Sequence, residues 1–118
     1  MEARHVRGDY SSVPYLNSGS ALAAGEIITF AARPAIVHPT GIAAGALGNI
    51  VVFGGEWELA KSGAGPAVTL GDEVAWITST NFATDVLTAN LHFGFCTEAV
   101  ASSATVVKAF FNPHGSTT

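Results

Sequence analysis

The residue types that most often form catalytic or metal sites are present in this sequence, but their spacing forms no recognisable site. His5, His38, His92 and His114 are far apart, and no His-x-x-x-His or Cys-x-x-Cys pattern occurs. A metal site would therefore need ligands from distant segments to converge. No serine lies in the Gly-x-Ser-x-Gly turn that exposes the nucleophile of many hydrolases. We expect no catalytic residue, no metal ligand, no cofactor and no enzymatic activity.

Glu56 and Glu58 form the arrangement closest to an acid–base pair. Residues two apart in a strand share one face, so both carboxylates are expected to lie opposite Trp57. Two carboxylates can act as general acid and general base when they flank a substrate. Because these two bracket an indole instead, we interpret them as a solvated acidic edge over a buried Trp57.

Three other residues with reactive side chains are interpreted as structural. Cys96 is the only cysteine, which excludes an intrachain disulfide, and it lies in an apolar run, so we expect a buried thiol. His92 alternates with apolar neighbours on a predicted strand and is interpreted as a surface or interface imidazole. His38 precedes a proline and is expected to mark the end of a strand.

The two tryptophans lie on segments that have the pattern of β-strands. Residues 56–59 alternate polar and apolar, and Gly71-Asp72 is a turn signal directly before the segment that carries Trp76. We expect both indoles in the core, each burying about 150–250 Å². Trp57 is also a candidate interface residue, since tryptophan is enriched at binding hot spots.

Short strands separated by Gly, Pro, Ser, Asn and Asp predict an all-β fold, a small β-barrel or β-sandwich of the β-tulip kind. The Gly-rich segment 40–48 matches no nucleotide-binding fingerprint and is interpreted as a loop. The small residues at 99–104 predict a turn before the last strand. The expected strands cover residues 26–32, 35–38, 49–54, 56–60, 66–69, 73–78, 91–96 and 104–111.

Residues 1–19 have no period of 2 or 3.6 and are expected to form an extended N-terminal arm. Tyr10, Pro14 and Tyr15 are candidate anchors for a neighbouring subunit, because such side chains offer contact area at low entropic cost. The alternative is a frayed terminus without a role. The predicted organisation is an arm over 1–19, one β domain over 20–112 and a C-terminal tail over 113–118.

Composition favours a component of an assembly. The chain has 118 residues, which suits one domain, and 48% of them are hydrophobic. Only 12% are charged, against about 25% in typical globular domains, and the mean hydropathy is +0.37. So little charge suggests that part of the surface does not face water. A monomer rich in Ala and Gly remains the alternative.

Charge and hydropathy patterning also exclude some partners. The net charge is −4 with five Lys and Arg, so no basic stripe is available for phosphates and no direct nucleic-acid partner is expected. No apolar stretch approaches the roughly 18 residues of a membrane span, and the N-terminus lacks the apolar region of a signal peptide. We expect no membrane partner and a protein that stays where it is made.

Five segments in succession resemble one known family, the capsid-cement or head-decoration proteins of tailed bacteriophages. The segments are AGEII (24–28), IVVFGGEWELAK (50–61), GDEVAW (71–76), FGFCTEA (93–99) and TVVKAFF (105–111). The resemblance covers most of the chain after about residue 20. The arm before it is longer than is usual in these proteins, so the role of the arm is not implied by the resemblance.

The resemblance implies a structural protein that binds the outer surface of the assembled shell, contacts the major capsid protein and stabilises it as a homotrimer. It implies a location in the virion, after synthesis in the cytoplasm of the bacterial host. Two alternatives remain open. One is a small β-barrel module that binds carbohydrate or another ligand through exposed Trp57 and Trp76, and the other is an enzyme of unrecognised type.

Overall fold

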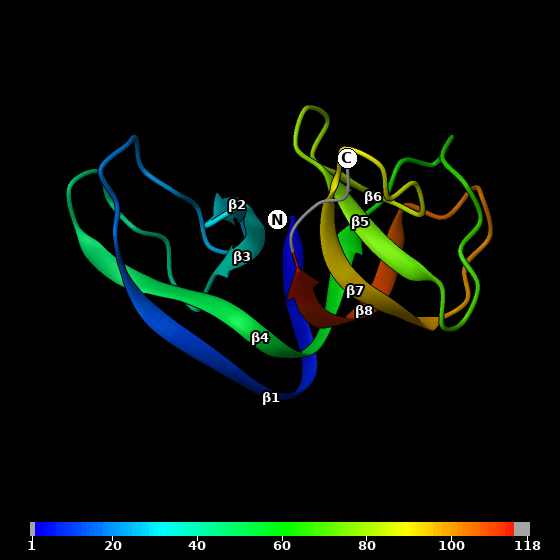
Figure 1. Ribbon diagram of the computed structural model, residues 1–118, viewed down its shortest axis with the longest axis horizontal. Coiled ribbons are helices and arrows are strands. Elements are labelled where there is room, and N and C mark those ends of the chain that lie inside the picture. The colour runs from blue at the N-terminus through cyan, green and yellow to red at the C-terminus, as the bar shows by residue number, and fades with distance from the viewer. Residues whose placement is uncertain (1, 115–118) are drawn as a thin grey trace.

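The computed structural model describes residues 2–114, which contain eight β-strands and no helix. The strands are β1 (Ala3–Leu16), β2 (Ile27–Phe30), β3 (Arg33–Val37), β4 (Leu47–Ala60), β5 (Glu73–Ile77), β6 (Phe82–Thr84), β7 (Leu91–Glu98) and β8 (Val106–His114). All the strand pairs are antiparallel, in the order β2-β3-β4-β8-β7-β5-β6, and β1 pairs with β4 beside this path. The sheet curls into a half-barrel (Figure 1), which confirms the predicted all-β class.

Two long strands, β1 and β4, join the two lobes visible in Figure 1. Their shared bend lies at glycines with positive φ, namely Gly8 (86°), Gly54 (92°) and Gly55 (82°). A Cβ at Gly54 would lie 2.7 Å from the carbonyl oxygen of Asp9, so only glycine fits where the two backbones cross the bend. Residues 49–54 and 56–60, expected as two strands, are therefore one continuous strand that serves both lobes.

The segment expected to form an arm is strand β1. It pairs with β4 from Ala3 opposite Leu59 to Leu16 opposite Leu47. Three register shifts interrupt the pairing, and each one moves the following side chains relative to the two faces of the sheet. The strand consequently has no continuous alternation of polar and apolar residues, which is why the sequence did not predict it.

Two smaller differences concern the ends of the chain and the loops. Strand β6 was not predicted, and the strand expected at 66–69 is reduced to an isolated bridge at Val68. Strand β8 continues to His114, so the expected tail over 113–118 begins inside a strand, and residues 115–118 lie outside the described part. The predicted turn at Gly71-Asp72 is confirmed, because Gly71 has a φ of 86° and the Asp72 amide donates to the Thr69 carbonyl at 3.1 Å.

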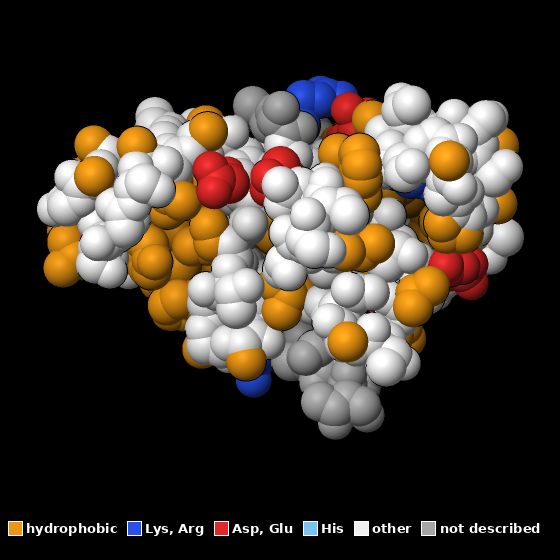
Figure 2. Space-filling view, turned by 90° about the horizontal axis from the view of Figure 1, so that it is seen from above, with side chains coloured by type: hydrophobic (Ala, Val, Ile, Leu, Met, Phe, Trp, Pro, Cys, Tyr) orange, Lys and Arg blue, Asp and Glu red, His pale blue; other side chains and the backbone are white. Residues whose placement is uncertain are grey.

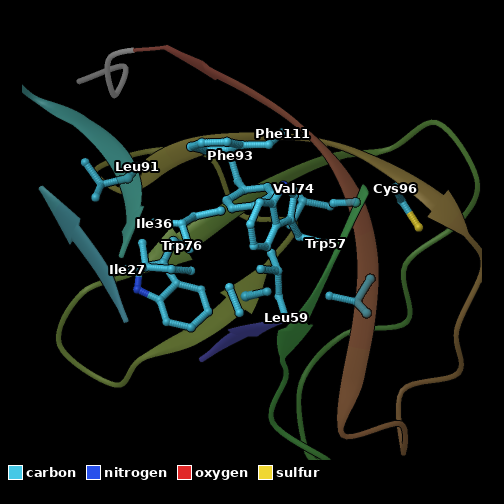
Figure 3. Close-up of a cluster of buried hydrophobic side chains, with 14 of the residues drawn as sticks. Ile27, Ile36, Trp57, Leu59, Val74, Trp76, Leu91, Phe93, Cys96 and Phe111 are labelled. Atoms are coloured by element: carbon cyan, nitrogen blue, oxygen red, sulfur yellow. The ribbon is translucent and has the colours of Figure 1, made fainter. Parts of the chain in front are cut away.

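The main core lies between the lobes and inside the lobe that β4, β5, β7 and β8 form. In Figure 3 the rings of Trp57, Trp76, Phe93 and Phe111 lie together, with Leu59 beside them. Phe93 and Phe111 have ring centroids 4.5 Å apart. A second, smaller cluster fills the other lobe and contains Ala35, Val37, Ile42 and Ile50.

The two lobes repeat one structural unit. The order β2-β3-β4-β1 in the first lobe corresponds to β5-β7-β8-β4 in the second, so β4 belongs to both. Gly25 and Glu26 exchange backbone hydrogen bonds with Val37, and Gly71 and Asp72 exchange the equivalent pair with Cys96. Isolated antiparallel bridges, Leu22 with Ile42 and Val68 with Val100, occupy corresponding places beside these turns.

A buried polar side chain closes each unit at the end of its long strand. Asn17, after β1, places its amide nitrogen 2.9–3.3 Å from the carbonyl oxygens of Ser20, Ile42 and Ala43. Lys61, after β4, places its ammonium 2.9–3.3 Å from those of Ser62, Ser102 and Ala104. In each lobe one side chain thus donates to three carbonyl oxygens of the adjoining loops, some of which also accept a backbone N–H.

Candidate functional site

Two of the predicted interface residues, Tyr10 and Trp57, meet in one cluster of rings. The Tyr10 centroid lies 5.7 Å from Trp57, 5.1 Å from His5 and 5.2 Å from His38. Tyr10 is 37% exposed, whereas Trp57 is fully buried and donates its indole N–H to the Gly54 carbonyl at 2.9 Å. Tyr10 covers the cluster from the solvent side, and Trp57 belongs to the core.

The other two predicted interface residues lie apart from this cluster, farther along β1. Pro14 is exposed, and Tyr15 is half-buried with its ring edge against Phe30, at a centroid distance of 6.1 Å. A proline at a sheet edge lacks the N–H that another strand would need for pairing, which is typical of protected edges. The four candidates therefore do not form one continuous surface.

The burial of both tryptophans argues against the alternative of a carbohydrate-binding module. Stacking against sugar rings requires exposed indoles, and both Trp57 and Trp76 have 0% exposure. The interpretation of the two residues as core is confirmed.

Glu56 and Glu58 form ion pairs across β1 instead of a free acidic edge. Arg7 Nε lies 2.7 Å from Glu56 Oε1, and Arg4 Nη2 lies 3.0 Å from Glu58 Oε1. The Thr97 hydroxyl also donates to Glu56. The two carboxylates are thus paired with cations of β1.

The remaining reactive side chains are structural in the described residues. Cys96 is buried as predicted, and burial raises the pKa of its thiol. His92, interpreted from the sequence as a surface or interface imidazole, is 2% exposed and its Nδ1 lies 3.0 Å from Glu73 Oε1. It is one of four successive buried residues at the start of β7, so this part of the strand is covered on both faces. Residues 2–114 contain no group of three or more His, Cys, Asp and Glu placed to hold a metal ion.

The surface best suited to contact another protein is a stripe of three phenylalanines across β4, β8 and β7. Phe110 lies in the middle, with its ring centroid 5.9 Å from that of Phe53 and 5.4 Å from that of Phe95. The outer rings of this aromatic stripe are 48% exposed for Phe53 and 43% exposed for Phe95. Aromatic rings held by neighbouring strands offer large contact area with little loss of rotamer entropy on binding.

Charged side chains border the aromatic stripe. Glu56 pairs with Phe110 in the register of β4 and β8 and carries the ion pair with Arg7. Beyond it lie Glu58 with its partner Arg4, and Lys108, which is opposite Glu58 on β8. An apolar centre with a polar rim is the usual composition of a protein–protein interface.

Strand alternation does not predict that Phe95 lies outside while Phe93 lies inside. Residues two apart on a regular strand share a face, but the pairings of β7 with β5 and with β8 both shift register between His92 and Gly94, which breaks that rule. Gly94 is required there, because a Cβ would lie 1.8 Å from the carbonyl oxygen of Phe110. A glycine between two aromatic residues was the one signal of such a bulge.

The surface as a whole is poor in charge. Figure 2 shows mostly apolar and uncharged polar atoms on the face in view, with a few acidic and basic side chains between them.

Within residues 2–114 no helix is long and apolar enough to span a membrane.

Comparison with known proteins gives one match. A family model described as phage cement protein matches residues 7–110, which include the three phenylalanines of the aromatic stripe. Searches of curated proteins and of solved structures found no match.

Proposed function

Because the chain belongs to the phage cement protein family, which has a structural role in the phage capsid, we propose that it binds the outer surface of the assembled shell and stabilises it. Its direct partner is the major capsid protein. The structural observation that supports this proposal, in addition to family membership, is the aromatic stripe. It is an exposed apolar surface, of the kind that marks a contact with another protein.

Stabilisation requires only that the protein prefer the assembled shell. A ligand that binds the assembled state and not the separated subunits shifts the equilibrium toward assembly by mass action. As a homotrimer, the protein brings three copies of each contact to the shell, and the second and third contacts form at high effective concentration. Contacts that are weak individually then hold firmly together.

The outer surface suits the charge of the chain. The interior of a filled shell faces packaged nucleic acid, whose phosphates repel a protein of net charge −4 with five basic residues. Three of the basic residues, Arg4, Arg7 and Lys61, already lie against carboxylates or backbone carbonyls. Little positive charge is left to offer to a nucleic acid.

The test is binding of purified protein to undecorated capsids of the phage that encodes it, measured by co-sedimentation and by the temperature at which the shells disrupt. Replacing Phe53 and Phe95 by Thr should weaken binding by at least tenfold, since aromatic anchors at an interface typically contribute about 1–2 kcal/mol or more each. Phe82→Thr is the matched control, because Phe82 is 37% exposed on β6, outside the stripe.

Equal binding of the stripe variant and the control would remove the aromatic stripe from the proposal. Failure of the unaltered protein to bind or stabilise capsids would contradict the proposed function itself.

A further inference from the structure

The repeated unit ends in an equivalent pair of loops in each lobe. The first tip consists of residues 16–24 and 40–47, and the second tip consists of residues 62–70 and 99–106. Each is built on the bridge between its two loops and on one buried polar side chain, Asn17 or Lys61. In Figure 1 the two tips lie at opposite ends of the long axis, along which the molecule extends 39 Å.

Each tip exposes large apolar side chains, one of which occupies the same position in both tips, whereas Leu16 and Leu70 correspond to Ala60 and Ala24 of the other tip. Leu47 begins β4 and Val106 begins β8, where they pair with the last residues of β1 and β4, Leu16 and Ala60. The exposed fractions are 63% for Leu16, 70% for Leu47 and 41% for Val106, and Leu70 adds 71% in the second tip. Leu16, Leu47 and Leu70 are among the most exposed large apolar side chains in the described residues. Exposed apolar side chains of this size add little to the stability of the folded chain.

Neither tip contains a charged side chain at its surface. No Asp, Glu, Lys or Arg occurs in the residues of the first tip or in those of the second. Lys61 lies beneath the second tip, but it is 2% exposed and its ammonium is turned to backbone carbonyls. Figure 2 shows the far end of the first lobe, at the left, as apolar and uncharged atoms.

Uncharged tips select an uncharged partner surface. A charged group of a partner that docked on the apolar centre of a tip would lose water and meet no charged residue of the tip itself, which costs several kcal/mol. Carboxylates adjoin both tips, where Glu26 accepts from the Ala23 N–H and Asp72 accepts from the Thr69 N–H. An apolar patch would lose no such solvation, and depletion of charge is the usual mark of the centre of a protein interface. Because both tips have the same architecture and the same lack of charge, they favour the same kind of partner surface.

We infer that the two tips are two copies of one docking site, which bind equivalent apolar patches on two neighbouring subunits of the major capsid protein. This inference rests on the proposed function, since a shell of identical subunits presents the same patch at regular intervals. Each chain then bridges the joint between two subunits by itself, and oligomerisation multiplies a bridge that already exists in one chain.

Bivalent attachment has a measurable consequence. Once one tip is bound, the other meets its patch at the effective concentration that the rigid connection through β4 sets. Removing either tip leaves one attachment site per chain, so both removals should cause similar losses of apparent affinity, on the order of 10²–10⁴-fold. Attachment through only one tip would make one of the two removals harmless.

The experiment compares two double variants with a matched control. Leu16→Thr with Leu47→Thr alters the first tip, and Leu70→Thr with Val106→Thr alters the second. Threonine has a high propensity for β-strands, so it is compatible with the backbone at these positions. Because the replaced side chains are exposed, a loss of binding is not explained by unfolding. Val86→Thr is the control, because Val86 is 57% exposed and lies outside both tips. Binding to undecorated capsids is measured by co-sedimentation, and oligomeric mass by light scattering.

Similar losses from both tip variants, with unchanged oligomeric mass and a control that binds normally, are the expected result. Normal binding of either tip variant would overturn the inference while leaving the proposed function intact, provided that the unaltered protein binds. A tip variant that changes the oligomeric mass would show instead that the tip joins copies of this chain, which also overturns the inference. Absence of binding by the unaltered protein would contradict the proposed function first.

Discussion

At the residue scale, the two tryptophans differ in one property that can be measured. Both have 0% exposure, but Trp57 donates its N–H to Gly54, whereas no described residue accepts from Trp76 Nε1. A buried donor without a partner costs about 1–3 kcal/mol, and so does a carbonyl that loses its donor. Identical substitutions at the two positions therefore have different consequences.

We predict that Trp57→Phe lowers the free energy of unfolding by about 1–3 kcal/mol more than Trp76→Phe does. The first variant leaves the Gly54 carbonyl unpaired, and the second removes an N–H that was already unpaired. Loss of side-chain volume is common to both and largely cancels. Urea titration of both proteins, with equal m-values as the control, measures the difference. Equal losses would mean that an ordered water pairs with Trp76.

The sequence was informative about residues whose role depends on type and immediate neighbours. The burial of Cys96 and the positive φ of Gly71 follow from an apolar run and a Gly-Asp turn, and both are confirmed. The positions of His92 and Phe95 could not be predicted, because the first lies where β7 is covered on both faces and the second depends on register shifts between strands that are distant in the sequence. Such shifts are set by pairing across the sheet, which a single strand does not encode.

At the element scale, β1 is the strand whose contribution the sequence understated. Its first residues cover one edge of β4, with Ala3 buried at 1% exposure and the His5 ring 4.9 Å from that of Trp57. The same region was expected to act in attachment only. Its paired backbone and buried contacts indicate that it is needed for the fold.

Deleting residues 1–16 should abolish cooperative thermal unfolding, because the deletion exposes both the edge of β4 and the ring of Trp57. The total free energy of unfolding of such a domain is only about 5–15 kcal/mol, so the loss of these contacts is large in comparison. Differential scanning calorimetry measures the transition. Arg4→Ala with Arg7→Ala is the control, since exposed ion pairs contribute only about 0–1 kcal/mol each. A truncated chain that melts like the full chain would restore the interpretation of this segment as an arm.

The repeated unit was also invisible in the sequence, although each copy has a recognisable motif. The copies read LAAGE, IAAGA, VTLGD and VASSA, an apolar bridge residue followed by a turn. They occur at uneven intervals, because β6 and its loops are inserted in the second unit only. The last copy lacks glycine, so no single residue type marks all four turns.

At the scale of the whole molecule, the residues of both tips are uncharged, and carboxylates adjoin them at Glu26 and Asp72. The described ion pairs involve β1, β4, β5, β7 and β8, whereas the tips carry none of the charged residues. A small soluble chain usually spreads charge over its surface to remain dispersed. The uncharged residues of the two tips, with their exposed apolar side chains, are suited to contact with other proteins.

We expect the protein to be a trimer in solution or to become one on the shell. A chain of 118 residues with 12% charge and several exposed aromatic and aliphatic side chains has more apolar surface than a monomer of this size needs. A cyclic trimer would cover part of that surface and present both tips three times, so that each contact with the shell assists the others. If the trimer forms in solution, light scattering gives three times the 12.1 kDa mass of one chain. Imaging of decorated capsids should show the protein in groups of three.

A monomer in solution, together with single, separate copies on the shell, would contradict the trimer. It would not contradict the inference that one chain bridges two capsid subunits, which the tip variants test separately.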